Sequence, residues 1–537
     1  MSAARPAPRL LAAFATVGAW TLASRVLGFV RDVMMASALG AGPVAQAFVA
    51  AFTLPNLFRR FFAEGAFNTA FVPMFTRRLT AEGRDEARAF AEQALAALTA
   101  VLLVLTLLAQ LAMPWLVLAL TAGFAGDDRL PLAVQMGRIA FPYILFISLT
   151  ALLSGVLNAL GRFAVAAAAP VALNVILIGA LALAETGWLA GAVSLNPPPG
   201  GPVEGLHAGA LLTWGVAAAG VAQLALVWRA AARAGFPLRL RLPRLTPQVR
   251  RLAVVAFPAA LAGGVMQINL VVGRQVASFF DGAVAWLYYA DRLYQLPLGV
   301  IGVAVGIVLL PELARRAAAG DEAGARHSVS RSMEFALALT LPATVALLVI
   351  PGPLTAVLFG RGAFGPEDVT ATAWAVAIYG AGLPAFVLTK IVQPLFFARE
   401  DTRTPYRLAL WGMAVNALVA VGLAPLIGFL AAALATTTAS WLVLFLLWRR
   451  ARAFGEAARP DARAARRLPR LLAASLLMGA VCLGVEAALA DWLVLPGWRW
   501  AALAALVGGG IAAYGAAVLA FGAMTLGDLR DGLRRRG

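Results

Sequence analysis

Charged side chains stand inside apolar stretches of this sequence that are long enough to cross a lipid bilayer. The acids at that depth are Asp32, Glu64 and Asp291, and the cations are Arg25, Arg31, Arg59, Arg60, Arg274, Arg292 and Lys390. An arginine in hydrocarbon costs at least about 2.5 kcal/mol, so it faces a protein interior or a watery cavity and marks a functional site. Three acids cannot neutralise seven cations. The excess predicts an anionic ligand, because the planar guanidinium fork suits phosphate oxygens.

Two alternatives stay open for part of this set. Internal salt bridges between helices account for about half of the cations. Arg60 and Glu64 are four residues apart, a spacing at which opposite charges pair on a helix. Arg274, Arg59 and Arg60 also suit the cytoplasmic interface, where the aliphatic stem stays in lipid and the charged head reaches water.

Spacing along a helix groups some of these residues. Ser24, Gly28 and Arg31 stand at i, i+4 and i+7, which places them on one helical face. Arg25 and Asp32 are also seven residues apart and lie on nearly the same side. The first apolar stretch therefore presents a polar face to the rest of the protein.

Lys390 is the only lysine in the chain. Because it stands in an apolar stretch, we expect its position to require a compact ammonium group or a shifted pKa. The alternative is that the lysine occurs there by chance. We expect the residues that tune charge or gating in the cavity to be Ser24, Asp32, Arg60, Glu64, Asp291 and Lys390.

The composition is that of a helical membrane protein. Of the 537 residues, 61% are hydrophobic and 13% charged, whereas soluble globular chains carry about 25% charged residues. A spanning helix needs about 20 apolar residues. About fourteen such stretches are predicted: 11–39, 44–72, 90–120, 132–159, 164–185, 208–229, 250–280, 284–312, 330–354, 369–398, 405–424, 428–448, 471–490 and 499–524. The predicted fold class is an all-α polytopic membrane protein.

The arginines are distributed unevenly between the predicted loops. Of 43 arginines, 33 fall in alternate loops and at the two ends, and four lie in or beside the intervening loops. Cytoplasmic loops carry the excess of Lys and Arg, so both termini are predicted to be cytoplasmic and the proline-rich segment 196–202 external. This pattern explains the net charge of +18 without a nucleic acid partner.

The sequence repeats itself at an offset of about 240 residues. Pro73 with Arg77-Arg78 matches Pro311 with Arg315-Arg316, an offset of 238, and Arg162 matches Arg403, an offset of 241. The offset covers six predicted helices, an even number, so the copies have the same orientation and related lobes with a site between them. The predicted layout is a six-helix lobe (1–235), an interfacial cytoplasmic linker (236–249), a second six-helix lobe (250–452), a basic cytoplasmic linker (453–470) and two extra transmembrane helices with a tail (471–537).

Motifs for covalent chemistry are missing from the sequence. A P-loop needs a lysine after its glycines, and Lys390 has no such context. The two histidines and single cysteine form no metal-ligand cluster. A glycosyltransferase or phosphatase that acts on a membrane lipid stays as an alternative, but its candidate carboxylate pairs, Asp127/Asp128 and Glu367/Asp368, fall in short outer loops.

Three segments resemble the MurJ (MviN) lipid II flippase family. They are SRVLGFVRD at 24–32, LPNLFRRFFAEGAF at 54–67 and YYADRL at 288–293. The family belongs to the multidrug/oligosaccharidyl-lipid/polysaccharide exporter superfamily, whose core has two MATE-like lobes of six helices. The resemblance covers essentially the whole chain, although the two C-terminal helices are matched only in layout.

The resemblance implies a function and a site. Lipid II, an undecaprenyl-diphosphate-linked peptidoglycan precursor, would move from the cytoplasmic to the periplasmic leaflet of the bacterial inner membrane. The family's cavity cations correspond to Arg25, Arg31, Arg59 and Arg292, its cavity acid to Asp32, and the extra helices to a groove for the lipid tail. It implies a monomer with no cofactor, with membrane lipids and the cell-wall synthesis machinery as further partners. A flippase for another polyprenyl-diphosphate oligosaccharide and a MATE-like exporter remain as alternatives.

The sequence departs from the family at two positions. Gln46 and Gln295 stand where family members can carry acids. If those acids serve coupling or gating, this protein uses Asp32, Glu64 or Asp291 instead.

Overall fold

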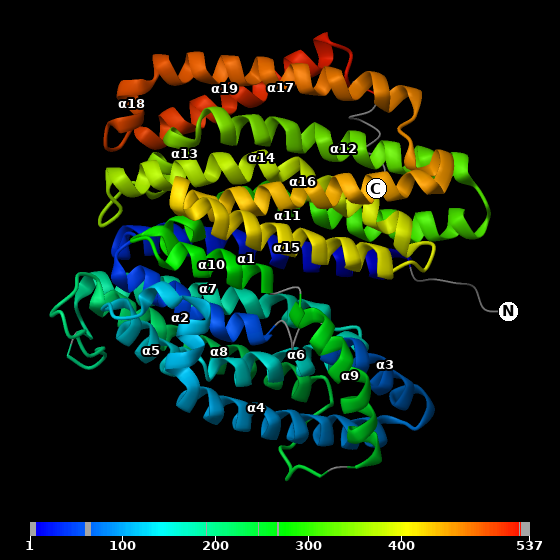
Figure 1. The fold of residues 1–537 in the computed structure, drawn as a ribbon. Helices are drawn as coiled ribbons and strands as arrows, with labels where there is room; N and C mark the ends of the chain where they lie inside the picture. The colour runs from blue at the N-terminus through cyan, green and yellow to red at the C-terminus, as the bar shows by residue number, and fades with distance from the viewer. Residues whose placement is uncertain are drawn as a thin grey trace. The chain divides into compact units, whose positions relative to one another are not determined.

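The computed structural model describes residues 7–59, 66–189, 191–244, 246–265, 268–525 and 527. Throughout these ranges the regular elements are helices (Figure 1). Ten of them are long and apolar enough to cross a membrane. The predicted all-α polytopic fold is thereby confirmed, while the count of about fourteen spans stays a prediction.

Contacts between residues divide the chain into two compact units, described separately below. Unit 1 comprises residues 1–285 and 362–364, and unit 2 comprises residues 286–361 and 365–537. Helix α11 (Ala283–Ala318) begins at the end of unit 1, and most of its residues belong to unit 2. The other helices of unit 1 are α1 (Ala7–Leu39), α2 (Pro43–Arg59), α3 (Ala66–Ala81), α4 (Arg84–Leu120), the 3₁₀ turn η2 (Ala122–Phe124), α5 (Arg129–Ala140), α6 (Tyr143–Ala159), α7 (Phe163–Thr186), α8 (Leu206–Arg233), α9 (Pro247–Val265) and α10 (Ile268–Ser278).

Helix packing in unit 1 brings α1 against α7, α7 against α8, and α2 against α5. Aromatic rings fill one part of its core, where Phe71 stacks on Phe75 and Phe90 with ring centroids 5.6 Å apart. A buried polar pair joins three of its helices: the Tyr143 hydroxyl lies 3.1 Å from Gln223 Oε1, and the Gln223 amide donates to the Ala169 carbonyl. The unit therefore has a rigid interior on which α1 and α2 are held.

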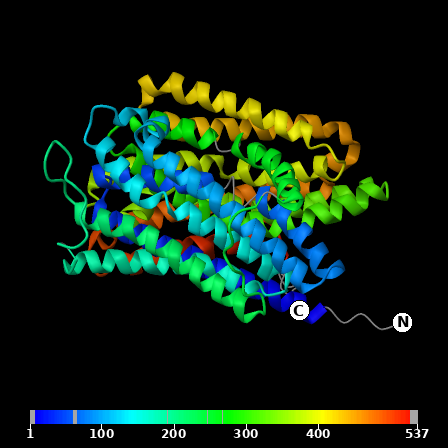
Figure 2. The ribbon, with the colours of Figure 1, turned by 90° about the horizontal axis from the view of Figure 1, so that it is seen from below.

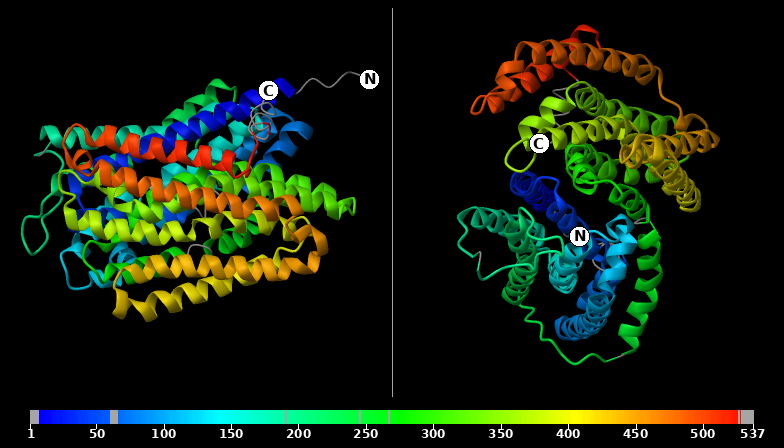
Figure 3. Two further views of the ribbon diagram at one scale, coloured as in Figure 1. Left: turned by 90° about the horizontal axis from the view of Figure 1, so that it is seen from above. Right: turned by 60° about the vertical axis from the view of Figure 1, so that its left-hand side comes forward.

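Unit 2 contains α12 (Glu322–Val349) and the helices that follow it. They are α13 (Pro351–Phe359), α14 (Pro366–Phe397), α15 (Arg403–Ile427), α16 (Leu430–Ala451), the 3₁₀ segment η3 (Arg452–Ala458), α17 (Ala462–Ala488), α18 (Ala490–Val494) and α19 (Arg499–Ala520). Helices α15 and α16 form a neighbouring pair, drawn in yellow and orange in Figure 2. Helix α17 packs on both α12 and α19 (Figure 3), so the two C-terminal helices pack on unit 2 through α12.

Helix bounds repeat the sequence offset. Helices α4 and α12 begin 238 residues apart, at 84 and 322, and α7 and α15 begin 240 residues apart, at 163 and 403. The division by contacts differs from the predicted lobes, because α9 and α10 pack on unit 1. Hydrogen bonds hold α10 in this unit. Gln275 in α10 donates to the carbonyls of Leu118 and Ala119, and the Ala122 amide donates to Gln275 Oε1.

Three predicted segments differ in detail from the observed helices. The stretch 132–159 is divided into α5 and α6 by a turn at Phe141–Pro142. The stretch 330–354 lies in α12 and α13, which are separated at Ile350, just before Pro351. The predicted linker 453–470 is helical from Ala462 onward, because Asp461 caps α17 by accepting the Ala464 amide hydrogen at 2.7 Å.

Residues 236–244 of the linker have no regular secondary structure and are anchored to α4. Phe236 and Leu238 are buried, whereas Leu240 and Leu242 are exposed, as the alternating sequence predicts. The fully buried Glu92 carboxylate accepts the Arg239 amide hydrogen at 3.0 Å. Arg241 forms a second contact with Glu92, an ion pair.

Candidate functional site

The buried polar centre of unit 1 is built on α1. The Arg31 guanidinium contacts Asp32 Oδ1 through Nε at 3.0 Å and Nη2 at 2.6 Å, and it contacts Asn174 Oδ1 through Nη1 at 3.0 Å. Arg31 is 8% exposed and Asp32 is 1% exposed. A charged arginine is tolerated here because a carboxylate and an amide receive its donors.

Asn174 on α7 connects this centre to Ser24. Its Nδ2 donates to the Ser24 carbonyl at 2.9 Å and lies 3.4 Å from Ser24 Oγ. A Cβ at Gly28 would come within 3.5 Å of the same amide, so the glycine allows α1 to approach α7 closely. The predicted face of Ser24, Gly28 and Arg31 is confirmed, since all three meet Asn174.

Sequence reasoning missed Asn174. The signal was available, because Asn174 is the one amide in the otherwise apolar stretch Phe163–Leu183. A polar side chain inside a transmembrane helix faces the protein interior and needs a partner. Its partner lies 143 residues away in the sequence, and nothing local to either helix identifies that pairing.

Other cations of unit 1 stand in different environments. Arg25 is exposed and makes no hydrogen bond or ion pair with the described part of the chain. Arg59 is the last residue of α2 and is half-buried. Arg274 donates from Nη1 to the Val49 carbonyl of α2 at 3.2 Å, so it serves in part as a link between α10 and α2. Arg60 and Glu64, including their expected pairing, lie outside the described residues.

Gln46 is buried beside an arginine rather than facing open space. Its Oε1 accepts from Arg129 Nη1 at 3.2 Å. The same guanidinium contacts Asp127 through Nε at 2.6 Å and Asp281 through Nη1 at 3.2 Å, and its Cζ lies 4.6 Å from the Phe124 ring centroid. This position therefore serves to satisfy the buried Arg129.

The charged residues of unit 2 lie on two helices. On α11, the Arg292 guanidinium lies 4.5 Å from the ring centroid of Tyr288, a cation–π contact. Asp291 accepts a hydrogen bond from the Gln295 amide one turn later. Lys390 is exposed on α14. In this unit the structure thus pairs Asp291 with Gln295, the position where family members can carry an acid.

Chemically, these residues offer guanidinium groups and few acids. Within the described ranges, no group of three or more His, Cys, Asp or Glu side chains is placed to hold a metal ion. The arrangement suits binding of an anion by arginine forks. Ten candidate spans and helix bounds that repeat at about 240 residues define a polytopic helical membrane protein with an internal repeat.

Comparison with known proteins agrees with this class. A solved structure described as "Lipid II flippase MurJ, inward closed conformation" superposes with a TM-score of 0.74 at 22% identity, covering 96% of this chain and 99% of that one. An inward-facing multidrug resistance MATE family transporter of the MOP superfamily superposes with a TM-score of 0.64 at 14% identity, covering 80% and 95%. These two likenesses concern the fold.

Sequence similarity identifies the family. The sequence model of the lipid II flippase MurJ family matches residues 35–496. The probable lipid II flippase MurJ of Rhizobium meliloti (strain 1021) is 46% identical, covering 98% of this chain and 96% of the relative. The chain belongs to the lipid II flippase MurJ family, and it is accordingly a protein of the bacterial inner membrane.

Proposed function

We propose that this protein moves lipid II from the cytoplasmic to the periplasmic leaflet of the inner membrane by alternating access. The observation that carries the proposal is the family match over residues 35–496, together with the arginines of α1 and α2. The cargo has a diphosphate that must cross the hydrocarbon and a polyprenyl tail that can remain in it. Cationic forks supply the diphosphate with a partner while it is out of water.

The arginines take different parts in this proposal. Arg25, exposed and without an acid partner among the described residues, offers its whole fork to the diphosphate. Arg31 is held by Asp32 and Asn174, so its guanidinium stands at a fixed place within a neutral ion pair beside the substrate. Arg59 and Arg292 complete the cationic set, and Asp291, Lys390, Arg60 and Glu64 tune its charge.

Transport in this proposal involves no bond breaking. Two lobes related by a repeat alternate in opening a central cavity to each side of the membrane. The lipid tail follows a lateral path beside α17 and α19, because moving it through water would expose each CH₂ at about 0.8 kcal/mol. The protein acts as a monomer with both termini in the cytoplasm, and it delivers lipid II to the cell-wall synthesis machinery.

A second candidate is a flippase for another polyprenyl-diphosphate oligosaccharide, since the diphosphate chemistry is shared. The MATE-like fold also allows an exporter of organic cations. Such cargo calls for acids in the cavity, and the excess of arginine argues against it.

The test is a leaflet-resolved measurement of lipid II in cells depleted of this protein and complemented with variants. Arg25→Ala, Arg59→Ala and Arg292→Ala should each reduce transfer per folded molecule, and lysine should restore it only in part because it lacks the fork. Normal transfer in all three alanine variants, normalised to folded protein in the membrane, would show that these cations do not form the substrate site.

A further inference from the structure

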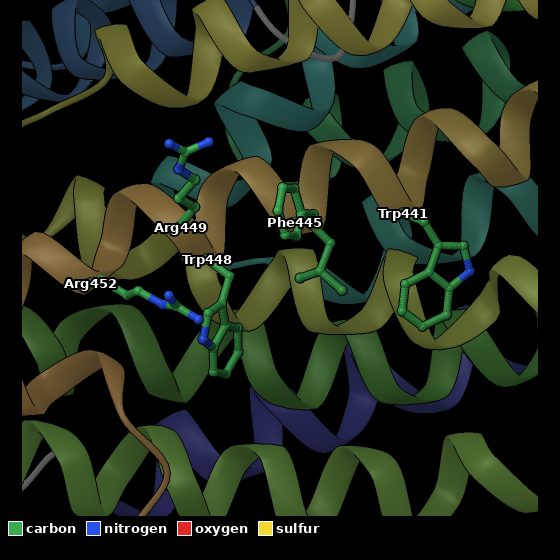
Figure 4. Close-up of a pocket in the computed structure, with 6 residues that line it drawn as sticks. Trp441, Phe445, Trp448, Arg449 and Arg452 are labelled. Carbon is green, nitrogen blue, oxygen red and sulfur yellow. The ribbon is translucent and has the colours of Figure 1, made fainter.

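The C-terminal end of α16 carries an open groove of about 410 Å³ (Figure 4). Its lining residues are Trp441, Leu444, Phe445, Trp448, Arg449 and Arg452. The aromatic rings lie along the helix, and the two arginines stand at its end, as Figure 4 shows. The groove is thus apolar along most of its length and cationic at one end.

The two arginines are not neutralised by the protein. Arg449 and Arg452 are exposed, and neither forms a hydrogen bond or an ion pair through its side chain with the described residues. Acids are available nearby but serve elsewhere: Glu456, four residues after Arg452, pairs with Arg326 at 3.1 Å. The groove therefore ends in two positive charges for which the fold supplies no counter-charge.

The apolar wall lies along a helix that spans the membrane. Residues 430–458 form one of the candidate spans. Phe445 is 62% exposed, and the Trp441 ring is fixed because its indole N–H donates to the Ala381 carbonyl at 3.0 Å. Tryptophans gather at the headgroup level of a bilayer, with basic residues just beyond the hydrocarbon. With this helix in a bilayer, the order of residues would put the rings toward the acyl chains and the arginines toward the headgroups.

We propose that this groove binds an anionic phospholipid, separately from the flippase substrate. The phosphate lies between Arg449 and Arg452, and the first part of an acyl chain packs on Trp448 and Phe445. Charge complementarity selects the anionic headgroup, because a zwitterionic lipid brings a cationic group beside its phosphate and has no net charge to set against the two arginines. The aromatic wall selects a lipid over a free phosphate ion, which has no apolar part to cover it.

The test uses purified protein in vesicles of phosphatidylcholine that contain increasing fractions of phosphatidylglycerol. In one series the phosphatidylglycerol carries brominated acyl chains, and in the other the phosphatidylcholine carries them. Bromine quenches tryptophan fluorescence at contact, and the signal of Trp448 is obtained as the difference between the wild-type protein and Trp448→Phe. Brominated phosphatidylglycerol should quench this signal at a low mole fraction, and brominated phosphatidylcholine should not. Equal quenching by the two lipids would overturn the proposal.

Arginine variants separate a site from general surface charge. The double change Arg449→Gln/Arg452→Gln should weaken the phosphatidylglycerol effect by about fivefold per arginine. The matched control is Arg450→Gln/Arg459→Gln, which removes the same charge from exposed residues of the same segment that do not line the groove. An equal loss in this control would mean that no groove site exists.

Two further arms complete the design. Arg449→Lys/Arg452→Lys keeps the charge and should retain most of the binding, which gives a second measurement if the glutamine variant folds poorly. Inorganic phosphate in the millimolar range should leave the quenching unchanged. The assignment would be overturned if phosphate displaced the lipid. It would also be overturned if the lysine variant lost the quenching while the glutamine variant bound the lipid normally.

Discussion

At the scale of single residues, two arginines on one helix are in opposite situations. Arg31 is enclosed by Asp32 and Asn174, while Arg25, six residues earlier, is exposed. A buried guanidinium is held by its partners, and removing one partner leaves a donor without an acceptor. An exposed guanidinium contributes to ligand binding with little effect on folding. The same residue type therefore supports the fold at one position, and under the proposed function it binds the substrate at the other.

Arg25→Gln and Asn174→Leu should separate these two roles. We expect Arg25→Gln to weaken lipid II binding by about tenfold to hundredfold, the loss of a charge-assisted hydrogen bond of about 1.5–3 kcal/mol, with unchanged thermal stability. Asn174→Leu should destabilise the protein by about 1–3 kcal/mol, because Arg31 Nη1 loses its acceptor. Lipid II binding and thermal unfolding of both purified variants test this. The reverse pattern would contradict the assignment of roles.

Gln46→Glu should be tolerated. The carboxylate would accept from Arg129 as the amide does at 3.2 Å, and it would share the charge of Arg129 with Asp127 and Asp281. We expect a stability change within about 1 kcal/mol and normal transfer of lipid II, whereas Gln46→Leu should cost about 1–3 kcal/mol. Thermal unfolding and the leaflet-resolved assay measure both. A loss of transfer in Gln46→Glu with intact stability would show instead that the neutral side chain matters for function.

The sequence predicted part of this site, because the positions of residues on one helix follow from their spacing along the chain. Periodicity alone placed Ser24, Gly28 and Arg31 on one face, and the excess of cations indicated an anionic ligand. The choice of Asp32 rather than another acid as the partner of Arg31, and the presence of Asn174, depend on how α1 packs on α7. Such pairings follow from tertiary contacts between distant segments.

At the scale of elements, charged groups join the start of α17 to α12. Glu334 lies 2.7 Å from Arg331 and 3.5 Å from both Arg463 and Arg467. Asp461, the residue before α17, accepts from Arg331 Nη2 at 2.7 Å. The predicted span 471–490 begins nine residues after the start of α17, because the basic residues before it indicated a linker. In the structure, ion pairs with Glu334 compensate the charges of Arg463 and Arg467.

Asp461 should make this junction sensitive to acid. Burial opposes its charged form, but the Ala464 amide and the Arg331 guanidinium outweigh burial and hold the pKa of Asp461 below its ordinary value. A lowered pKa in the folded state stabilises the fold above the unfolded value, about 3.9, and this contribution is lost as pH falls through the folded value. Asp461→Asn, which keeps a capping side chain, should therefore be less stable than the wild type at pH 7.

The stability gap between wild type and Asp461→Asn should begin to narrow near pH 4, where Asp461 of the unfolded wild-type chain takes up a proton. It should narrow further as the pH falls toward the lower pKa of the folded state. Thermal unfolding across pH 3–7 measures it. Asp461→Ala also removes the cap and should cost about a further 1 kcal/mol at every pH. A gap that stays constant between pH 3 and pH 7 would mean that the charge of Asp461 does not stabilise the junction.

At the scale of the whole molecule, the repeat and the packing divide the chain in different ways. The offset of about 240 residues assigns α9 and α10 to the second lobe, yet their contacts assign them to unit 1. A repeat shows which segments are related in sequence, whereas a compact unit shows which segments contact one another in the fold. The sequence alone identified the repeat. The compact unit is identified by the packing of α9 on α3 and α4 and by the hydrogen bonds of Gln275, Ser278 and Arg274 to α4, η2 and α2.

The distribution of arginine makes a prediction about the orientation of the whole chain. With 33 of 43 arginines in alternate loops and at the ends, we expect Arg459 to be cytoplasmic and Pro198 to be external. The single native cysteine, Cys482, is buried among α17 and α19, and Cys482→Ala gives a background without reactive thiols. In that background, Pro198→Cys should react with a membrane-impermeant maleimide in intact spheroplasts, and Arg459→Cys should react only after permeabilisation. Labelling of position 459 from outside would invert the topology, and lipid II would then have to enter from the opposite side of the proposed cavity.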